Sequence, residues 1–271
     1  MPSFWEHLRF AGAGEDEPGQ SYDSSFGAES QDMAIYVSHP LPSAGADFPS
    51  IIVIQEAFGV NRHIEKVCDR FAAEGYVAIA PALFHREHPN PKLGYGDEDA
   101  PARNRYMGAL DDAEIVEDIN MVIKWTQSDQ FRRTNGKKIG IVGFCVGGRI
   151  AYLAATSCSG IDAASVYYGG RILIPMGEGD VAPIDLTSQI KVPIMGNFGG
   201  KDENPSPADV VTIETALKAA GVTYDFKSYP DVGHGFNCDE RGSYNEAAAS
   251  DAWSRTVGFF AQNLKSAAGV R

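Results

Sequence analysis

The chain of 271 residues contains 44% hydrophobic and 22% charged residues, a composition and a length that suit one α/β domain around a single core. Its formal net charge of -13 at pH 7 argues against a nucleic-acid partner, because an acidic surface repels phosphate backbones. No apolar run approaches the ~20 residues that cross a bilayer, and the first residues, MPSFWEHLRF, lack the basic and apolar regions of a secretory signal. We therefore expect a cytoplasmic protein without a membrane or nucleic-acid partner.

The cysteines and histidines do not follow the spacing of a metal or redox centre. Four cysteines are present: Cys68, Cys145, Cys158 and Cys238. None belongs to a CxxC pair, and reduced thiols are the usual state in a cytosolic enzyme. His85 and His88 stand three apart, which permits metal ligation, but no further ligand cluster accompanies them. We therefore predict neither a metal site nor a cofactor.

Strand and helix patterns alternate along most of the chain. Residues 1–30 are rich in Gly, Ser, Asp and Glu, and they predict an N-terminal extension ahead of a single domain over 31–271. The predicted strands cover 51–54, 76–80, 138–143, 164–168, 192–198 and 223–229. The predicted helices cover 63–74, 105–126, 149–156, 208–220 and 246–264. A polar loop covers 85–102 and is long enough to have a function beyond connecting two elements. The alternation predicts an α/β fold with a mainly parallel sheet, helices on both faces, and a ligand site beyond the carboxyl ends of the strands.

The segment Gly143-Phe144-Cys145-Val146-Gly147 carries the strongest chemical signal. It fits G-x-nucleophile-x-G between a buried strand and a helix, where glycines let neighbouring backbone pass close to a tight turn. Cys145 then lies at a helix N-terminus, where the helix dipole favours a thiolate. The backbone N–H of Val146 is expected to face an oxyanion. The alternative is a buried structural cysteine in a glycine-rich turn.

A thiol nucleophile needs a base and an acid that orients the base. In this order of strands the acid should come first and the histidine second. Asp202 follows a predicted strand and a glycine turn, and it is the acid candidate, with Asp209 and Glu203 as rivals near the next helix start. His234, flanked by glycines after the last predicted strand, is the base candidate.

A carboxylate also ends the first predicted strand. Glu56 closes the run Ile51-Ile52-Val53-Ile54-Gln55, so it should lie in the site region. The alternative is a residue that only fixes the loop. The N–H of Ala57, in the same turn, is the candidate for the second oxyanion donor.

Four motifs in this order resemble the dienelactone hydrolase (carboxymethylenebutenolidase) family of α/β-hydrolases. They span about 50–240 and are Gln55-Glu56-Ala57-Phe58-Gly59-Val60-Asn61, Pro81-Ala82-Leu83-Phe84-His85-Arg86, Gly143-Phe144-Cys145-Val146-Gly147-Gly148, and Asp202 with His234-Gly235-Phe236. The resemblance implies a hydrolase in which Cys145 attacks a lactone carbonyl while His234, held by Asp202, moves protons.

The resemblance also implies roles around the nucleophile. Glu56 would contact the resting thiol and help form the thiolate, and Arg86 would bind a substrate carboxylate in bidentate fashion. Phe58, within the first motif, is expected to line the substrate site. The sequence departs from the family at the fourth residue after the histidine, where a second substrate-binding arginine is replaced by Cys238; Arg241 is the candidate substitute.

Three functions remain open at this point. The first is hydrolysis of a small, carboxylate-bearing lactone or ester through an acyl-cysteine. The second is a broad-specificity esterase or thioesterase on the same scaffold. The third is a non-catalytic module that binds or senses a small acid, with Cys145 as an oxidisable thiol. In each case the partner is a small molecule, and we expect a monomer or a homodimer.

Overall fold

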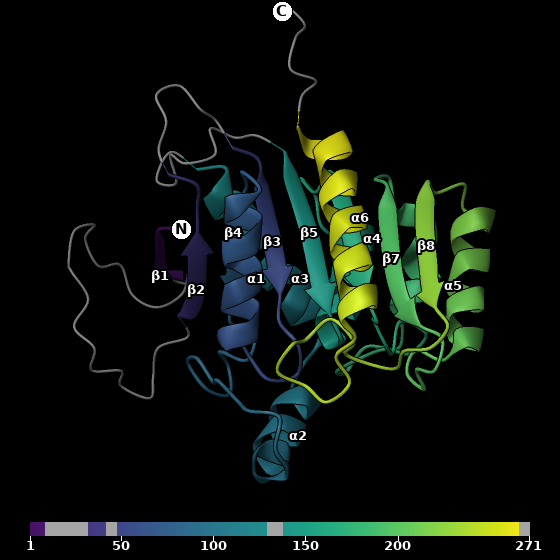
Figure 1. The fold of residues 1–271 in the computed structure, drawn as a ribbon, viewed down its shortest axis with the longest axis horizontal. Coiled ribbons are helices and arrows are strands. Elements are labelled where there is room, and N and C mark those ends of the chain that lie inside the picture. Colours follow the sequence, from purple (N-terminus) through teal and green to yellow (C-terminus); the bar gives the residue numbers. More distant parts are fainter. Residues whose placement is uncertain (9–31, 42–47, 129–137, 266–271) are drawn as a thin grey trace, which may run out of the picture.

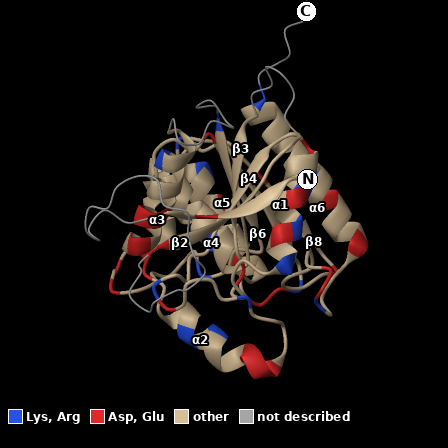
Figure 2. Ribbon diagram, turned by 90° about the vertical axis from the view of Figure 1, so that its left-hand side faces the viewer, with Lys and Arg blue, Asp and Glu red and all other residues tan. Residues whose placement is uncertain are grey.

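The computed structural model describes residues 1–8, 32–41, 48–128 and 138–265 (Figure 1). Within these ranges, every helix is too short or too polar to cross a membrane. Figure 2 shows charged residues on the outer helices and loops, including a basic helix beside an acidic 3-10 turn, Asp97–Asp99, at one end of the molecule.

A twisted sheet forms the centre of the described structure (Figure 1). Its eight strands are β1 (Ser3–Leu8), β2 (Met33–Ser38), β3 (Ser50–Ile54), β4 (Val77–Pro81), β5 (Ile139–Phe144), β6 (Ala163–Tyr167), β7 (Ile194–Gly199) and β8 (Tyr224–Tyr229). They lie in the order β1-β2-β4-β3-β5-β6-β7-β8. The pairs β1–β2 and β2–β4 are antiparallel, and all other pairs are parallel. The prediction of a mainly parallel α/β sheet is confirmed, with the order expected of an α/β-hydrolase.

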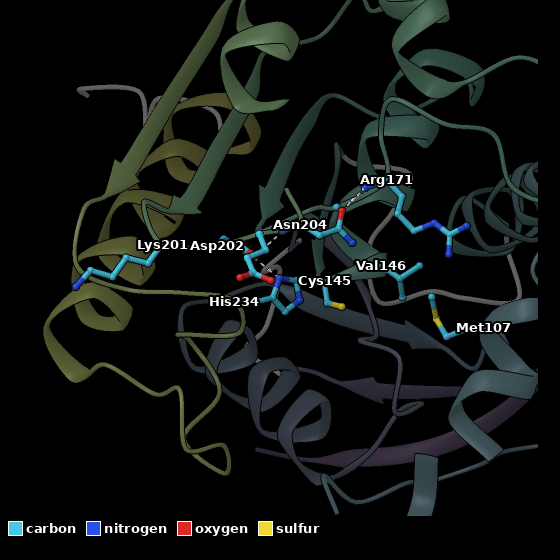
Figure 3. Close-up of a pocket in the computed structure, with 10 residues that line it drawn as sticks. Met107, Cys145, Val146, Arg171, Lys201, Asp202, Asn204 and His234 are labelled. Carbon is cyan, nitrogen blue, oxygen red and sulfur yellow. Dashed lines mark hydrogen bonds and ion pairs between the residues drawn. The ribbon is translucent and has the colours of Figure 1, made fainter. Parts of the chain in front are cut away.

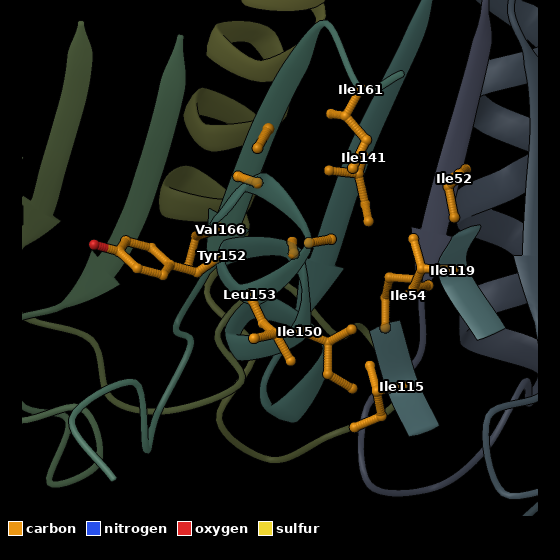
Figure 4. Close-up of a cluster of buried hydrophobic side chains, with 14 of the residues drawn as sticks. Ile52, Ile54, Ile115, Ile119, Ile141, Ile150, Tyr152, Leu153, Ile161 and Val166 are labelled. Atoms are coloured by element: carbon orange, nitrogen blue, oxygen red, sulfur yellow. The ribbon is translucent and has the colours of Figure 1, made fainter. Parts of the chain in front are cut away.

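Helices cover both faces of this sheet. They are α1 (Arg62–Ala73), α3 (Asp112–Thr126), α4 (Val146–Ser157), α5 (Pro207–Ala219) and α6 (Glu246–Leu264), with a second 3-10 segment at Pro183–Gln189. Helix α2 (Ala100–Gly108) has no buried residue and lies beyond the end of the sheet (Figure 1). One apolar cluster joins the sheet to α3, α4 and α5 (Figure 4), and a second joins it to α1 and α6. Along β3, Ile52 and Ile54 belong to the first cluster, whereas Ile51 and Val53 belong to the second. This strand is apolar throughout because both of its faces are buried.

Two predicted helix boundaries were wrong. The single helix expected over 105–126 is divided into α2 and α3, because the carboxylate of Asp111 accepts hydrogen bonds from Ala113 N and Glu114 N and so begins a new helix. The helix expected to begin at residue 149 begins at Val146, directly after Cys145.

The N-terminal part of the sheet was not predicted. Ser3–Leu8, inside the expected extension, forms the edge strand β1 against β2. Most of the remaining predicted extension lies outside the described residues. The division into an extension and one domain stays a prediction.

Candidate active site

Cys145 lies on the sharp turn between β5 and α4. Its φ of 57° and ψ of -122° are unusual for a residue with a side chain. The turn exists because two glycines leave room for backbone: a Cβ on Gly143 would lie 1.8 Å from the carbonyl oxygen of Gly147. A Cβ on Gly147 would lie 2.4 Å from the carbonyl oxygen of Gln55. The sequence motif therefore forms the tight turn that the sequence analysis predicts.

The backbone on either side of Cys145 is held in place by neighbouring elements. Cys145 N donates to Tyr167 O at 3.0 Å, which fixes the turn to the neighbouring strand β6. Val146 is the first residue of α4, and the first-turn amides of a helix have no acceptor within it. Ala57 follows the carboxyl end of β3, which pairs with β5 in parallel up to Ile54 and Gly143. The oxyanion roles of Val146 and Ala57 remain predictions.

Asp202 and His234 meet at the same edge of the sheet. Asp202 follows β7 and is 5% exposed, and its Oδ2 accepts a hydrogen bond from His234 Nδ1 at 2.9 Å. Its Oδ1 accepts from Asn204 N at 2.9 Å, which fixes the carboxylate plane. Of the rival acids, Glu203 lines the adjoining pocket, whereas Asp209 Oδ2 accepts from Ser206 N and Oγ at the start of α5.

His234 and Cys145 line the same pocket. Burial lowers the pKa of His234, but hydrogen bonds with Asp202 and Cys145 outweigh burial and raise this pKa from 6.5 to about 10. Figure 3 shows the imidazole of His234 between Asp202 and Cys145. An imidazole beside a thiol is the arrangement in which the ring can take the thiol proton, as a cysteine nucleophile requires.

A pocket of about 460 Å³ opens in front of Cys145. His234 and Asp202 line one part of it, while Met107 of α2 and Val146 line another (Figure 3). A volume of this order suits a small ligand. Helix α2 directly follows the long loop that was expected to be functional. Through Met107, this part of the chain reaches the pocket.

Arg171 is a pocket residue that the sequence did not reveal. It has a φ of 61° and follows two glycines after β6, and its backbone is held by Asn204 Oδ1 and by the buried guanidinium of Arg149. Its own guanidinium makes no ion pair with any residue that the structure describes. Arg149 in turn binds Asp112 at the start of α3, through two hydrogen bonds. The sequence signal for Arg171 was its position after the end of a predicted strand. Only the conformation of the loop places this residue at the pocket.

Glu56, Phe58 and Arg241 lie together beside the turn. Glu56 is 1% exposed, and its Oε1 is 3.5 Å from Arg241 Nη1. The guanidinium carbon of Arg241 stands 5.5 Å from the ring centroid of Phe58. The structure thus places these three predicted site residues together. The Glu56 carboxylate contacts Arg241, whereas the family resemblance implies a contact with the thiol of Cys145.

Arg86 lies elsewhere. Its guanidinium donates to both carboxylate oxygens of the buried Asp118, at 2.7 and 3.0 Å, and Glu114 lies 3.3 Å away. His85 Nε2 is 3.2 Å from Asp118 Oδ2, so this histidine belongs to the same polar group. The structure does not bring Arg86 to the pocket of Cys145.

Comparison with known proteins shows the family of this chain. The model of the “Dienelactone hydrolase family” matches residues 34–264. The chain belongs to the dienelactone hydrolase family. A “Putative carboxymethylenebutenolidase” of Synechocystis sp. is 38% identical over 233 residues, 86% of this chain and 93% of its own. A protein of the same name from Salmonella typhimurium is 35% identical over 241 residues, 88% of this chain and 86% of its own.

A solved structure shows the same fold. The crystal structure of a “Putative Dienelactone Hydrolase” from Klebsiella pneumoniae superposes with a TM-score of 0.76 and 30% identity, and covers 97% of this chain and 100% of its own. Dienelactone hydrolase relatives share the α/β-hydrolase fold, and the protein is a carboxylic ester or lactone hydrolase.

Proposed function

We propose that this dienelactone hydrolase relative cleaves a small lactone or carboxylic ester through an acyl-enzyme on Cys145. The observation that carries the proposal is that His234, hydrogen-bonded to the buried Asp202, lines the same pocket as Cys145. A base that is oriented by a buried carboxylate and lies beside a thiol is the arrangement that activates a cysteine nucleophile.

The reaction follows from these positions. The thiolate of Cys145 attacks the substrate carbonyl carbon, and the carbonyl electrons move onto oxygen. The oxyanion accepts hydrogen bonds from Val146 N and Ala57 N. When the carbon–oxygen bond to the leaving group breaks, His234 donates its proton to that oxygen. Water then attacks the thioester, His234 takes the proton from the water, and the acid leaves as the thiol or thiolate is restored.

Two carboxylates support the catalytic pair in this scheme. Because Asp202 is buried and accepts a hydrogen bond from Nδ1–H, it holds the ring with Nε2 toward the sulfur and stabilises the positive charge. Glu56 supports the same site from the β3 end, where its contact with Arg241 keeps a carboxylate and a guanidinium close to the turn.

We propose that Arg171 recognises an anionic group on the substrate. It lines the pocket and makes no ion pair with a described residue, whereas Arg86 is bound to Asp118. A guanidinium at a fixed loop position can bind a carboxylate through two hydrogen bonds. Carboxylate-bearing lactones and esters are therefore the favoured substrate class, and neutral esters are the alternative.

The nucleophile is tested with Cys145→Ala. Hydrolysis of p-nitrophenyl acetate and of a dienelactone should fall about a thousandfold or more, because no acyl-enzyme can form. Cys158→Ala is the matched control, since Cys158 lies at the far end of α4 and contacts Val116 O. Undiminished hydrolysis by Cys145→Ala would contradict the proposed mechanism, while acyl transfer to Cys145 can be seen directly by mass spectrometry of the intact protein.

Arg171 is tested by comparing two ester substrates that differ only in a carboxylate. Loss of a charge-assisted hydrogen bond costs about 1.5–3 kcal/mol, so Arg171→Met should lower kcat/KM roughly 10- to 150-fold for the acidic ester only. Arg62→Met, at a side chain that is 79% exposed on α1, removes the same charge away from the pocket and serves as control. Equal losses of kcat/KM on both substrates would show that Arg171 does not bind the substrate carboxylate.

A further inference from the structure

Three buried side chains from separate segments meet next to the turn of Cys145. Glu56 ends β3, His63 lies in the first turn of α1, and Cys238 follows His234 in the loop after β8. One carboxylate oxygen, one ring nitrogen and the sulfur all lie within 4.8 Å of one another. The three residues are 1%, 3% and 0% exposed, respectively. This is a cluster of metal-ligand atoms enclosed by protein.

Two atoms of the cluster lack partners among the described residues. Glu56 Oε2 and His63 Nε2 are both buried and accept or donate no hydrogen bond there. Buried polar atoms are almost always paired, because an unpaired one loses its interaction with water and gains nothing. Both atoms are electron-pair donors that a cation would satisfy. The remaining Glu56 oxygen, Oε1, is the one that faces Arg241.

The surroundings of His63 prepare it as a ligand. Its Nδ1 lies 3.7 Å from a carboxylate oxygen of Asp239, which favours the tautomer with the proton on Nδ1 and a lone pair on Nε2. Burial lowers the pKa of His63 although Glu56 and Asp239 act in the opposite direction. The ring is therefore neutral at physiological pH, as metal coordination requires.

We infer that Glu56, His63 and Cys238 form a binding site for a zinc-type divalent cation, with solvent as the fourth ligand. Thiolate, imidazole and carboxylate together are the donor set that Zn²⁺ accepts in proteins. Zinc–ligand bonds of about 2.0–2.3 Å place tetrahedral ligand atoms roughly 3.3–3.8 Å apart. Closing the cluster thus takes a contraction of about 1 Å between the ligand atoms.

The charges of the occupied site balance. Cys238 must lose its proton, and burial, followed by the charge of Glu56, raises the pKa of its thiol to about 11. Metal binding therefore releases this proton to solvent. The thiolate and Glu56 then carry two negative charges, which match the two on the metal, while the charge of Asp239 is offset by Lys66, 3.4 Å away.

Occupancy would join three parts of the candidate active site. The metal would link the end of β3, the start of α1 and the loop that carries His234. A ligand that binds only the folded chain stabilises it by mass action. The site departs from the sequence-based expectation that the chain holds no metal, because its ligands are far apart in sequence and follow no spacing rule.

The test uses the full chain with Cys145→Ala, which removes the pocket thiol as a competing ligand. Calorimetric titration with Zn²⁺ should show one equivalent bound. Co²⁺ should give the near-ultraviolet charge-transfer absorption of a thiolate ligand. Zn²⁺ at a hundredfold excess over its Kd should raise the unfolding temperature by roughly 5–10 °C. Absence of binding to this variant would overturn the inference.

Second substitutions locate the metal. Adding Cys238→Ser should abolish the cobalt–thiolate band and weaken Zn²⁺ binding at least about tenfold, and adding His63→Gln should weaken binding by a similar factor. Adding Cys158→Ser is the matched control and should leave binding unchanged, because this thiol lies on α4, next to Val116. Undiminished binding in either the Cys238 or the His63 variant would place the metal elsewhere and reject the site.

Discussion

Replacement of Gly147 by alanine tests whether the nucleophile turn depends on close backbone approach. The added Cβ would lie 2.4 Å from Gln55 O, 2.5 Å from Ile54 O and 2.9 Å from the carbonyl carbon of Ile54. Ordinary contacts begin at 3.4 Å, so the overlap with the first oxygen is 1.0 Å (3.4 - 2.4). The obstructing atoms are backbone at the end of β3, where Ile54 pairs with Gly143 of β5, and they cannot rotate away as a side chain would.

The expected cost follows from this overlap. Overpacking a well-filled interior costs about 1–3 kcal/mol, and a clash with fixed backbone belongs at the upper end. Alanine regains up to about 1 kcal/mol of helix propensity over glycine in α4. The net loss is about 2 kcal/mol, which lowers the unfolding temperature by roughly 4–8 °C for a chain of this size. Activity should fall at least about tenfold, because Cys145 and the amide of Val146 move with the turn.

Gly258→Ala is the matched control. Gly258 lies in α6, and a Cβ there meets no atom within 4 Å. This variant should gain about 0.5–1 kcal/mol and keep full activity. Calorimetric unfolding and ester hydrolysis measure both variants. If Gly147→Ala unfolds at the same temperature as the unsubstituted chain while Gly258→Ala is stabilised, the close approach of α4 to β3 does not constrain the turn.

Further predictions concern charge and packing. The folded-state pKa of His234, about 10, exceeds the ordinary 6.5, so the contribution of this histidine to stability is complete below about pH 6.5 and is lost as the pH rises through 10. Asp202→Asn should reduce this loss of stability, measured by urea unfolding across that pH range. An unchanged pH dependence would count against the ion pair. Arg149→Met leaves Asp112 without its buried partner and should cost about 3–5 kcal/mol in urea unfolding; a cost below about 1 kcal/mol would show that the pair is not needed. Phe260→Ala empties a fully buried position and should cost about 3–5 kcal/mol, a result that unaltered thermal unfolding would contradict.

Local sequence patterns determined most of the architecture. A run such as Ile51-Ile52-Val53-Ile54 is apolar on both faces and therefore predicts a strand covered by helices on both sides, as observed. The nucleophile motif was readable because its glycines serve contacts within a few residues of Cys145. The order of Cys145, Asp202 and His234 could also be read, since parallel strands place their carboxyl ends at one edge of the sheet.

Only the tertiary structure decided which side chains share a space. Arg86 and Arg171 both follow strands, yet Asp118 binds one while the other lines the pocket, and no local pattern distinguishes them. The meeting of Glu56, His63 and Cys238 likewise depends on how a strand, a helix and a distant loop pack. Hydrophobic periodicity is a property of neighbouring residues, whereas ion pairs and ligand clusters depend on long-range packing, which the sequence of any one segment does not encode.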